Sequence, residues 1–253
     1  MKVTFDSNNW FKIAQPERFP KHTESLEKIK NAIEIGDIIP YISETIFTLE
    51  IIQRKDRKAF FETYKPNINI KDEMTDDGVI KISFEIGHGN KLSLTKNPIL
   101  KELFEKSKNL GFRIGVLPRI AGLINYDIEE YKYLIEDLTR YQNEVFEVGK
   151  KIEDKGAGFS QIKAIGEAYD NNWVKGLALT PNSETERIAD AVAEWADGDS
   201  VAVSIALGCD YFCTSDIAKK AGSASVLSSV NLKWLHNDYG FNVISPEDLA
   251  RSL

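Results

Sequence analysis

Short apolar runs alternate with amphipathic stretches in the first 64 residues. Residues 1–5 (MKVTF) carry β-branched and aromatic side chains and end abruptly at the polar Asp6, which predicts a short buried strand. Residues 24–35 carry Leu and Ile at helical spacing and precede Gly36, a residue type that commonly follows the end of a helix. Together these segments predict a first β–α unit.

A second strand and a long apolar helix are predicted next. Residues 38–43 (IIPYIS) form a short apolar run. Pro40 favours an outer or edge position for this strand, because proline has no backbone N–H to donate to a neighbour. Ser43 is a suitable N-cap for a helix from Glu44 to about Phe61, which is apolar on nearly all sides.

The last 55 residues or so return to the same tight alternation. The pattern predicts helices over 199–207 and 226–236, and strands over 211–214 and 241–245. Strands that alternate with helices are typical of a parallel sheet. The terminal regions therefore predict an α/β fold.

Residues 65–183 differ in character and indicate an insertion. The runs VIKISFEI and KLSLT, separated by Gly87–Asn90, predict a β-hairpin within 68–95. A helix of about 25 residues is predicted to start near Asp127, with shorter helices over 161–169 and from Pro181 to Trp195. An apolar stripe typical of a core or a dimer seam follows the long helix: Tyr131, Leu134, Leu138, Tyr141, Val145, Val148 and Ile152.

Composition and charge narrow the classes of function. The chain has 253 residues, 42% of them hydrophobic, and a net charge of −7, so it is not a bulk electrostatic coat for nucleic acids. It has no apolar run long enough to span a membrane, and a cytoplasmic location is expected by default. Lys91–Arg119 carries seven basic and two acidic residues, which favours either a solvated surface or a rim that attracts phosphate.

A purely structural role does not easily explain the positions of three acidic residues. Asp6 and Asp216 each follow a short apolar strand, and ligands of open parallel sheets gather at the carboxyl ends of strands. Capping a helix or turning the chain is the alternative role for either residue. Glu50 lies in the apolar segment after the second strand, where a buried carboxylate needs a metal, a site or an ion pair, with Arg54 as the nearest partner.

A fourth acid comes from the C-terminal region. Asp199 begins an apolar helix, so capping is an alternative role, and its neighbour Asp197 could take its place. Several carboxylates in one site repel one another unless a cation neutralises them. Mg²⁺ or Mn²⁺ suits such an all-oxygen site, whereas the wide spacing of the three histidines argues against a histidine-based zinc site.

Four segments of the chain resemble the PIN-domain family of metal-dependent ribonucleases. They are VTFDSNNW, ISETIFTLE, GDSVAVSIALGCDYFCTSD and FNVISPEDL, in the order that the family has them. The resemblance implies a three-layer α/β/α domain whose core is formed by about 1–64 and 184–253, with about 65–183 inserted. It also implies a Mg²⁺ or Mn²⁺ site and hydrolysis of RNA. The site residues that it implies are the acids Asp6, Glu50, Asp199 and Asp216, braced by Asn8 and Thr214.

Two other classes of function stay open at this point. A catalytically silent module on the same fold would bind nucleic acid or a protein without cleaving anything. A haloacid-dehalogenase-like phosphatase also begins with a strand followed by Asp, but it needs a second Asp where this chain has Asn8. The partners expected for the nuclease are RNA, an inhibitory protein of the antitoxin kind and a second copy in a homodimer, with no membrane partner.

Overall fold

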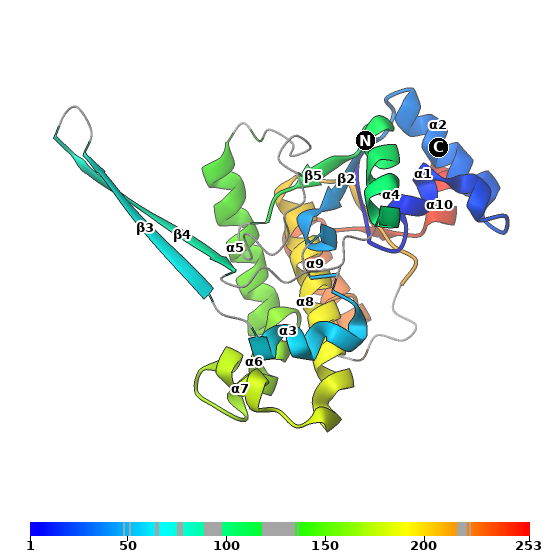
Figure 1. Cartoon of the computed structure of the whole chain (residues 1–253). Helices are drawn as coiled ribbons and strands as arrows, with labels where there is room; N and C mark the ends of the chain where they lie inside the picture. Colours follow the sequence, from blue (N-terminus) through cyan, green and yellow to red (C-terminus); the bar gives the residue numbers. More distant parts are fainter. Residues whose placement is uncertain are drawn as a thin grey trace.

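A five-stranded parallel sheet forms the centre of the molecule. The computed structural model describes residues 1–47, 49–50, 52–63, 66–74, 78–88, 98–117, 135, 137–216, 222 and 224–253. The strands lie in the order β5-β2-β1-β6-β7, and helices cover both faces, so the fold is the three-layer α/β/α arrangement that was expected (Figure 1). The strands are β1 (Lys2–Phe5), β2 (Ile39–Ser43), β5 (Arg113–Gly115), β6 (Tyr211–Cys213) and β7 (Val243–Ile244).

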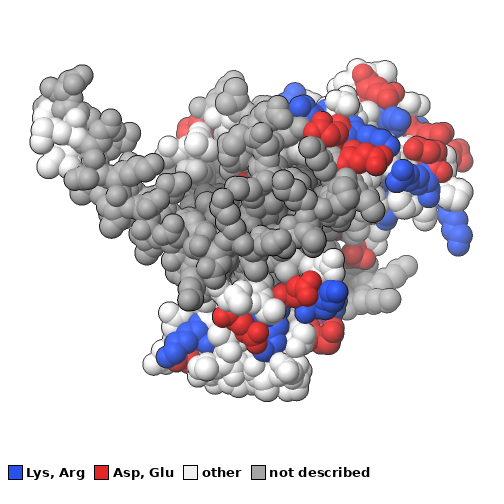
Figure 2. All heavy atoms as spheres, viewed as in Figure 1, with Lys and Arg blue, Asp and Glu red and all other residues white. Residues whose placement is uncertain are grey.

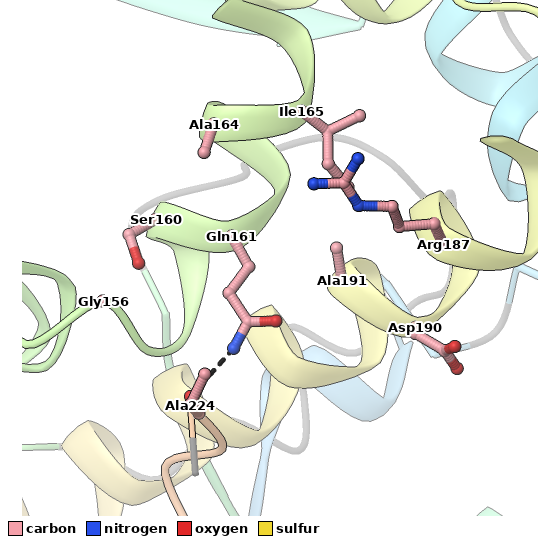
Figure 3. A pocket seen from close by; sticks show the side chains of 9 residues that line it. All are labelled: Gly156, Ser160, Gln161, Ala164, Ile165, Arg187, Asp190, Ala191 and Ala224. Atoms are coloured by element: carbon pink, nitrogen blue, oxygen red, sulfur yellow. Dashed lines mark hydrogen bonds between the residues drawn. The ribbon is translucent and has the colours of Figure 1, made fainter. Parts of the chain in front are cut away.

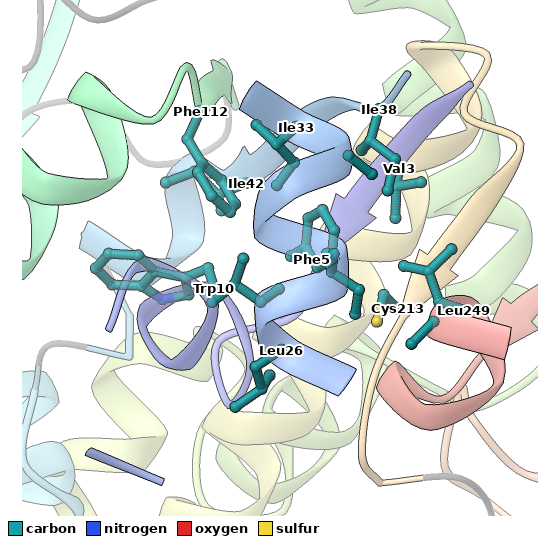
Figure 4. Packing of buried hydrophobic residues seen from close by; sticks show 14 of the residues in the cluster. Val3, Phe5, Trp10, Leu26, Ile33, Ile38, Ile42, Phe112, Cys213 and Leu249 are labelled. Carbon is teal, nitrogen blue, oxygen red and sulfur yellow. The ribbon is translucent and has the colours of Figure 1, made fainter. Parts of the chain in front are cut away.

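One face of the sheet is covered by helices from the two ends of the chain and from its middle. They are α1 (Trp10–Ala14), α2 (Thr23–Glu34), α4 (Pro98–Asn109) and α10 (Pro246–Ser252), with the 3₁₀ turn η1 (Pro16–Arg18) beside α2. Val3 and Phe5 of β1 and Ile42 of β2 are almost fully buried against them (Figure 4). Alternate residues of a strand face opposite sides, so Thr4 lies on the other face.

The opposite face packs against three further helices. They are α5 (Leu138–Asp154), α8 (Thr185–Ala206, preceded by the 3₁₀ turn η5, Asn182–Glu184) and α9 (Ser229–Tyr239). The predicted apolar stripe belongs to this core from Tyr141 onward, since Tyr141, Val145, Val148 and Ile152 are each at most 2% exposed and α5 packs along α8. Leu138 is 48% exposed, and Tyr131 and Leu134 lie outside the described residues. A third core lies around the first half of α8, where α3 (Arg57–Thr63), α6 (Phe159–Glu167) and α7 (Trp173–Leu179) surround Trp195.

The edge position predicted for the second strand is wrong. β2 lies between β1 and β5. Proline is tolerated there because successive residues of a parallel strand bond to opposite neighbours. The N–H of Ile39 donates to Met1 of the β1 side, so Pro40 is directed toward β5, whose pairing starts only at Tyr41.

The single helix predicted from Glu44 to Phe61 is also wrong. The segment forms a 3₁₀ turn η2 (Glu44–Phe47), a further turn, the 3₁₀ turn η3 (Arg54–Asp56) and only then α3. Contacts with distant parts of the chain override the helical pattern. The Glu44 carboxylate accepts a bond from the N–H of Leu117 (2.7 Å), and the Thr45 hydroxyl lies 2.9 Å from that of Ser200 on α8.

The hairpin exists, but its turn lies upstream of the predicted one. Strands β3 (Pro66–Met74) and β4 (Ile80–His88) pair antiparallel, so the run VIKISFEI is the second strand. Gly78 lies in the connection with φ of +80°, a conformation that favours glycine, and an Asp-Gly pair is a strong turn signal. The predicted partner KLSLT lies outside the described residues. One strand of the sheet, β5, also comes from the range assigned to the insertion.

The helix α5 begins at Leu138, and the Asp137 carboxylate caps it by accepting from the N–H of Arg140 (2.8 Å). The start predicted at Asp127 lies outside the described residues. The helices predicted over 181–195 and 199–207 are one continuous helix, α8.

Gly198 marks a close contact between α8 and the backbone that precedes α6. A Cβ atom at Gly198 would lie 3.0 Å from the Cα of Gly158, so glycine allows the helix and the segment before α6 to approach closely.

The smaller helices α1, α4 and α7 had no counterpart in the sequence prediction. Among the described residues, none of the helices combines the length and apolar character needed to cross a lipid bilayer.

Candidate metal centre

The first acid stands at the carboxyl end of the central strand. Asp6 directly follows β1, and its N–H donates to Cys213 at the end of the neighbouring β6 (3.0 Å). In the sheet, β1 lies between β2 and β6, and the chain continues from β1 to β2 on one side but forms β6 on the other side. Ligands of open α/β sheets bind at such a switch point. The Asp6 side chain is only 6% exposed.

Two further carboxylates meet Asp6 at this point. Carboxylate oxygens of Asp6, Glu50 and Asp197 all lie within 4.8 Å of one another. They come from three separate segments: the end of β1, the turn after η2, and the middle of α8. The structure thus brings together three of the acids that the sequence singled out, with Asp197 in the position expected for Asp199.

The geometry of α8 explains why only one of its two acids belongs to the cluster. Residues two apart on an α-helix are rotated by about 200° about its axis, so Asp197 and Asp199 lie on nearly opposite sides. Asp199 is 2% exposed and, among the described acids, is not part of the group that could share an ion. It lies inside the helix, so the capping role considered for it is excluded as well.

Glu50 is held near the cluster without an ion pair to Arg54. Arg54 instead binds Glu186 and Asp190 on the outer side of α8, at 3.0 and 2.5 Å. The Glu50 N–H donates to the carbonyl of Thr45 (3.2 Å), which fixes the turn that carries it. Its Oε2 atom is buried and has no hydrogen-bond partner, which is costly for a carboxylate unless a cation binds there.

Asn8 and Thr214 connect the cluster to Asp216 at its exposed side. The Asn8 amide donates to a carboxylate oxygen of Asp6 (2.9 Å) and to one of Asp216 (2.8 Å). Thr214 donates from its hydroxyl to Asp6 (2.5 Å) and accepts from the N–H of Asp216 (3.1 Å). Both residues are therefore hydrogen-bonded to the buried Asp6 and to the exposed Asp216.

Burial and mutual repulsion shift the pKa values of the three carboxylates. Burial raises the pKa of Glu50 to about 8, and the charge of Asp6 adds to the effect. Burial and then the charges of Asp6, Glu50, Glu194 and Asp216 hold the pKa of Asp197 well above its usual value. Burial also raises the pKa of Asp6, although the bond from Thr214 opposes this. Mutual repulsion of this kind is what a bound cation would relieve.

The donor set fits a hard divalent cation. Mg²⁺ and Mn²⁺ prefer oxygen ligands, and two oxygens on one Mg²⁺ lie at most about 4.2 Å apart. The three oxygens lie within 4.8 Å of one another, a bound close to this limit for one ion. The ion pairs among the described residues do not include these three carboxylates. The charge of Arg57 lowers the pKa of Glu50, but burial and the charge of Asp6 have larger effects in the opposite direction.

Three residues near the centre were not singled out by the sequence. The Ser7 N–H donates to Asp6 (2.6 Å), and a hydrogen bond from the Ser7 side chain lowers the pKa of Glu50. The buried Arg57 joins the Glu50 loop to α8 by donating to the carbonyls of Ile52 (3.3 Å) and Ala189 (2.6 Å). Glu194, one turn before Asp197, accepts from the N–H groups of Val226 and Gly158. Only Ser7 had a signal in the sequence, its position beside Asp6.

The basic segment Lys91–Arg119 is described over residues 98–117, and ion pairs within the protein use part of its charge. Lys106 pairs with Glu102 on α4 (2.9 Å), which also lies 3.9 Å from Arg18. On the face that Figure 2 shows, basic and acidic side chains alternate over the end of the molecule that carries α2 and α4. The choice between a solvated surface and a phosphate rim stays open.

A separate hollow of about 450 Å³ lies between α6 and α8 (Figure 3). Gln161 crosses it from α6 and donates to the carbonyl of Ala224 (2.8 Å), and Arg187 enters it from α8. None of the three clustered carboxylates lines it. The hollow is therefore not the metal centre.

Comparisons with known proteins do not assign this centre. No protein-family model, curated protein or solved structure gives a significant match to the chain. The resemblance to the PIN-domain family thus stays a prediction from four short segments.

Proposed function

We propose that this protein is a nuclease that hydrolyses phosphodiester bonds with the help of Mg²⁺ or Mn²⁺, and that RNA is its substrate. The observation that carries the proposal is the meeting of Asp6, Glu50 and Asp197 within 4.8 Å at the carboxyl end of the central strand. The choice of RNA rests on the resemblance to the PIN-domain family. An inhibitory partner of the antitoxin kind is part of the same expectation.

The position of each residue in the centre indicates its role. Asp6, Glu50 and Asp197 would hold the cation directly, because their oxygens converge. A bound divalent cation supplies a water of lowered pKa and stabilises the charge that builds on a phosphodiester oxygen. Asn8 and Thr214 orient Asp6 by donating to it, at 2.9 and 2.5 Å. Outer hydrogen bonds of this kind keep a ligand in its binding orientation.

Asp216 has a different role from the other acids. It is exposed, lies outside the group of three, and is connected to Asp6 by the hydrogen bonds of Asn8 and Thr214. From this position its carboxylate can accept a hydrogen bond from a water or from a substrate hydroxyl at the mouth of the site. Asn8 donates to both acids and so lowers the repulsion between them.

The test compares two isosteric variants on one helix. The purified chain is incubated with end-labelled single-stranded RNA of mixed sequence, with Mn²⁺ or with chelator. We expect cleavage in the presence of Mn²⁺ and none with chelator. The cleavage rate should fall at least about 100-fold in Asp6→Asn, Glu50→Gln and Asp197→Asn. Asp199→Asn is the matched control and should keep its activity, because Asp199 lies outside the cluster.

Three results would contradict the proposal. Binding of RNA without cleavage under all metal conditions would favour the silent binding module. Hydrolysis of a small phosphomonoester but not of RNA would favour the phosphatase. Equal losses in Asp197→Asn and Asp199→Asn, with both variants folded, would refute the assignment of Asp197 as the ligand from α8.

A further inference from the structure

Three buried hydroxyl groups meet where β2, η2 and α8 pack together. They belong to Ser43 at the end of β2, Thr45 in η2 and Ser200 on α8, which are 1%, 0% and 8% exposed. Burying a hydroxyl group is costly unless it forms a hydrogen bond. The contacts among these three groups therefore decide whether η2 and α8 can pack in this arrangement.

The hydroxyl of Thr45 is the centre of this network. It donates to the hydroxyl oxygen of Ser43 (2.9 Å), which also accepts from the N–H of Thr45 (3.3 Å). A hydroxyl group has one hydrogen to donate, so in the contact with Ser200, at 2.9 Å, the Ser200 hydroxyl is the donor and Thr45 accepts. Removing the Thr45 hydroxyl would leave both serine hydroxyls without this partner.

The bond between Thr45 and Ser200 acts on the part of α8 that carries Asp197. Ser200 follows Asp197 by three residues, and residues three apart lie on the same side of an α-helix, about one turn apart. A bond from Ser200 to η2 therefore turns the side of α8 that bears Asp197 toward the segment after β2. It fixes the rotation of α8 that the metal centre requires.

The same network contacts the segments that carry the other two carboxylates. The N–H of Glu50 donates to the carbonyl of Thr45 (3.2 Å), so the residue whose side chain binds α8 also holds the turn that carries Glu50. Strands β1 and β2 pair in parallel, so Asp6 after β1 and Ser43 at the end of β2 stand at the same edge of the sheet. One set of hydrogen bonds thus joins the segments whose carboxylates converge within 4.8 Å.

We propose that Thr45 is a positioning residue of the metal centre, whose hydroxyl sets the distance between Glu50 and Asp197 by its bond with Ser200. The proposal rests on the metal centre described under the proposed function. Apolar packing holds α8 against η2, but the hydrophobic effect has no preferred direction and does not fix a rotation. A hydrogen bond does, because it weakens steeply when its distance or angle changes.

The test separates the hydroxyl of Thr45 from its shape. Binding of Mn²⁺ to the full chain is measured by isothermal titration calorimetry for the wild type, Thr45→Val and Thr45→Ser. Valine keeps the shape of threonine without the hydroxyl, and serine keeps the hydroxyl. We expect the dissociation constant for Mn²⁺ to rise about 10–100-fold in Thr45→Val and to stay within about threefold in Thr45→Ser.

Thr180→Val is the control for the loss of a buried hydroxyl elsewhere. Thr180 is 5% exposed, and its hydroxyl donates to the carbonyl of Leu177 (2.8 Å) at the end of α7. This variant should be less stable in urea and should bind Mn²⁺ as tightly as the wild type. If Thr45→Val behaves in the same way, its role is structural only and the proposal is overturned.

Ser200→Ala removes the same hydrogen bond from the side of α8, so the test does not depend on the folding of Thr45→Val. It should raise the dissociation constant for Mn²⁺ about as much as Thr45→Val, and the double variant should add little to either. Fully additive losses would contradict a shared role. A wild type that binds no Mn²⁺ would overturn both this proposal and the metal centre, whereas equal binding by the wild type, Thr45→Val and Ser200→Ala would overturn this proposal alone.

Discussion

Replacing Glu50 by glutamine should make the metal-free protein more stable, in a way that depends on pH. Glu50 is half-buried, and its pKa is raised from 4.5 to about 8. A carboxyl whose pKa is higher in the folded state keeps its proton on folding, while the unfolded chain releases it. Between pH 4.5 and 8 the folded state binds more protons, so the free energy of unfolding falls as the pH rises.

The size of the effect follows from the same shift. A rise of 3.5 pKa units corresponds to about 5 kcal/mol as an upper limit, and partial exposure of Glu50 reduces the expected value to about 2–4 kcal/mol. Glutamine has nearly the same shape and cannot ionise, so it removes this cost. The variant should therefore gain about 2–4 kcal/mol over the wild type at pH 8 and about nothing near pH 4.5.

Urea unfolding, followed by circular dichroism in the presence of a chelator, measures this difference at both pH values. The control is Glu27→Gln, which changes an exposed glutamate of α2 and should show no pH-dependent gain. Adding Mn²⁺ at pH 8 should stabilise the wild type, by about 2.7 kcal/mol at one hundred times the dissociation constant, and stabilise Glu50→Gln much less. A Glu50→Gln variant that is no more stable than the wild type at pH 8 without metal would show that the charged Glu50 carboxylate has no free-energy cost in the folded state.

Three further predictions test other parts of the structure. Asn8→Ala and Thr214→Val should each lower Mn²⁺ affinity or RNA cleavage by about 10–100-fold, because both side chains donate to Asp6. Isothermal titration calorimetry measures the affinity, and the cleavage assay measures the activity. Unchanged values would show that Asp6 does not need these two hydrogen bonds. Gly176→Ala should destabilise the chain by about 1–3 kcal/mol, since a Cβ there would lie 1.9 Å from the Gly166 carbonyl oxygen. Thermal unfolding measures the loss of stability. The control is Gly111→Asn, at an open position with φ of +98°, which should have a smaller effect. Mn²⁺ should bind more weakly at pH 6 than at pH 8, because the raised pKa of Glu50, about 8, makes the metal compete with a proton; a constant affinity over this range would contradict it.

The order of the elements could be predicted because local pattern and tertiary packing agree there. The strand before Asp6, the helix before Gly36 and the strand before Asp216 are short, strongly patterned and end in polar or turn-forming residues. Each of these ends is fixed by the chain's own preferences. The positions of Asp6 and Asp216 at neighbouring strand ends follow directly from this pattern, and Asn8 and Thr214 follow from their spacing to those acids.

The choice between Asp197 and Asp199 could not be made in the same way. α8 has buried residues on nearly every side, so the spacing of its apolar residues does not show which face is turned toward β1. That rotation is set by contacts elsewhere, such as the close approach of Gly198 to Gly158 and the bonds that Glu194 makes to Val226 and Gly158. The breaks in the segment from Glu44 to Phe61 have a similar origin in distant hydrogen bonds.

The amino-acid sequence by itself determined the α/β alternation, the strand ends that carry Asp6 and Asp216, and the presence of an acid at position 50 that is hard to bury alone. Only the tertiary structure decided that Asp197 joins Asp6 and Glu50, that β2 lies inside the sheet, and that the hairpin turns near Gly78. The physical reason is that strand ends and caps depend on nearby residues. The rotation of a buried helix and the neighbour of a strand depend on which distant surfaces pack together.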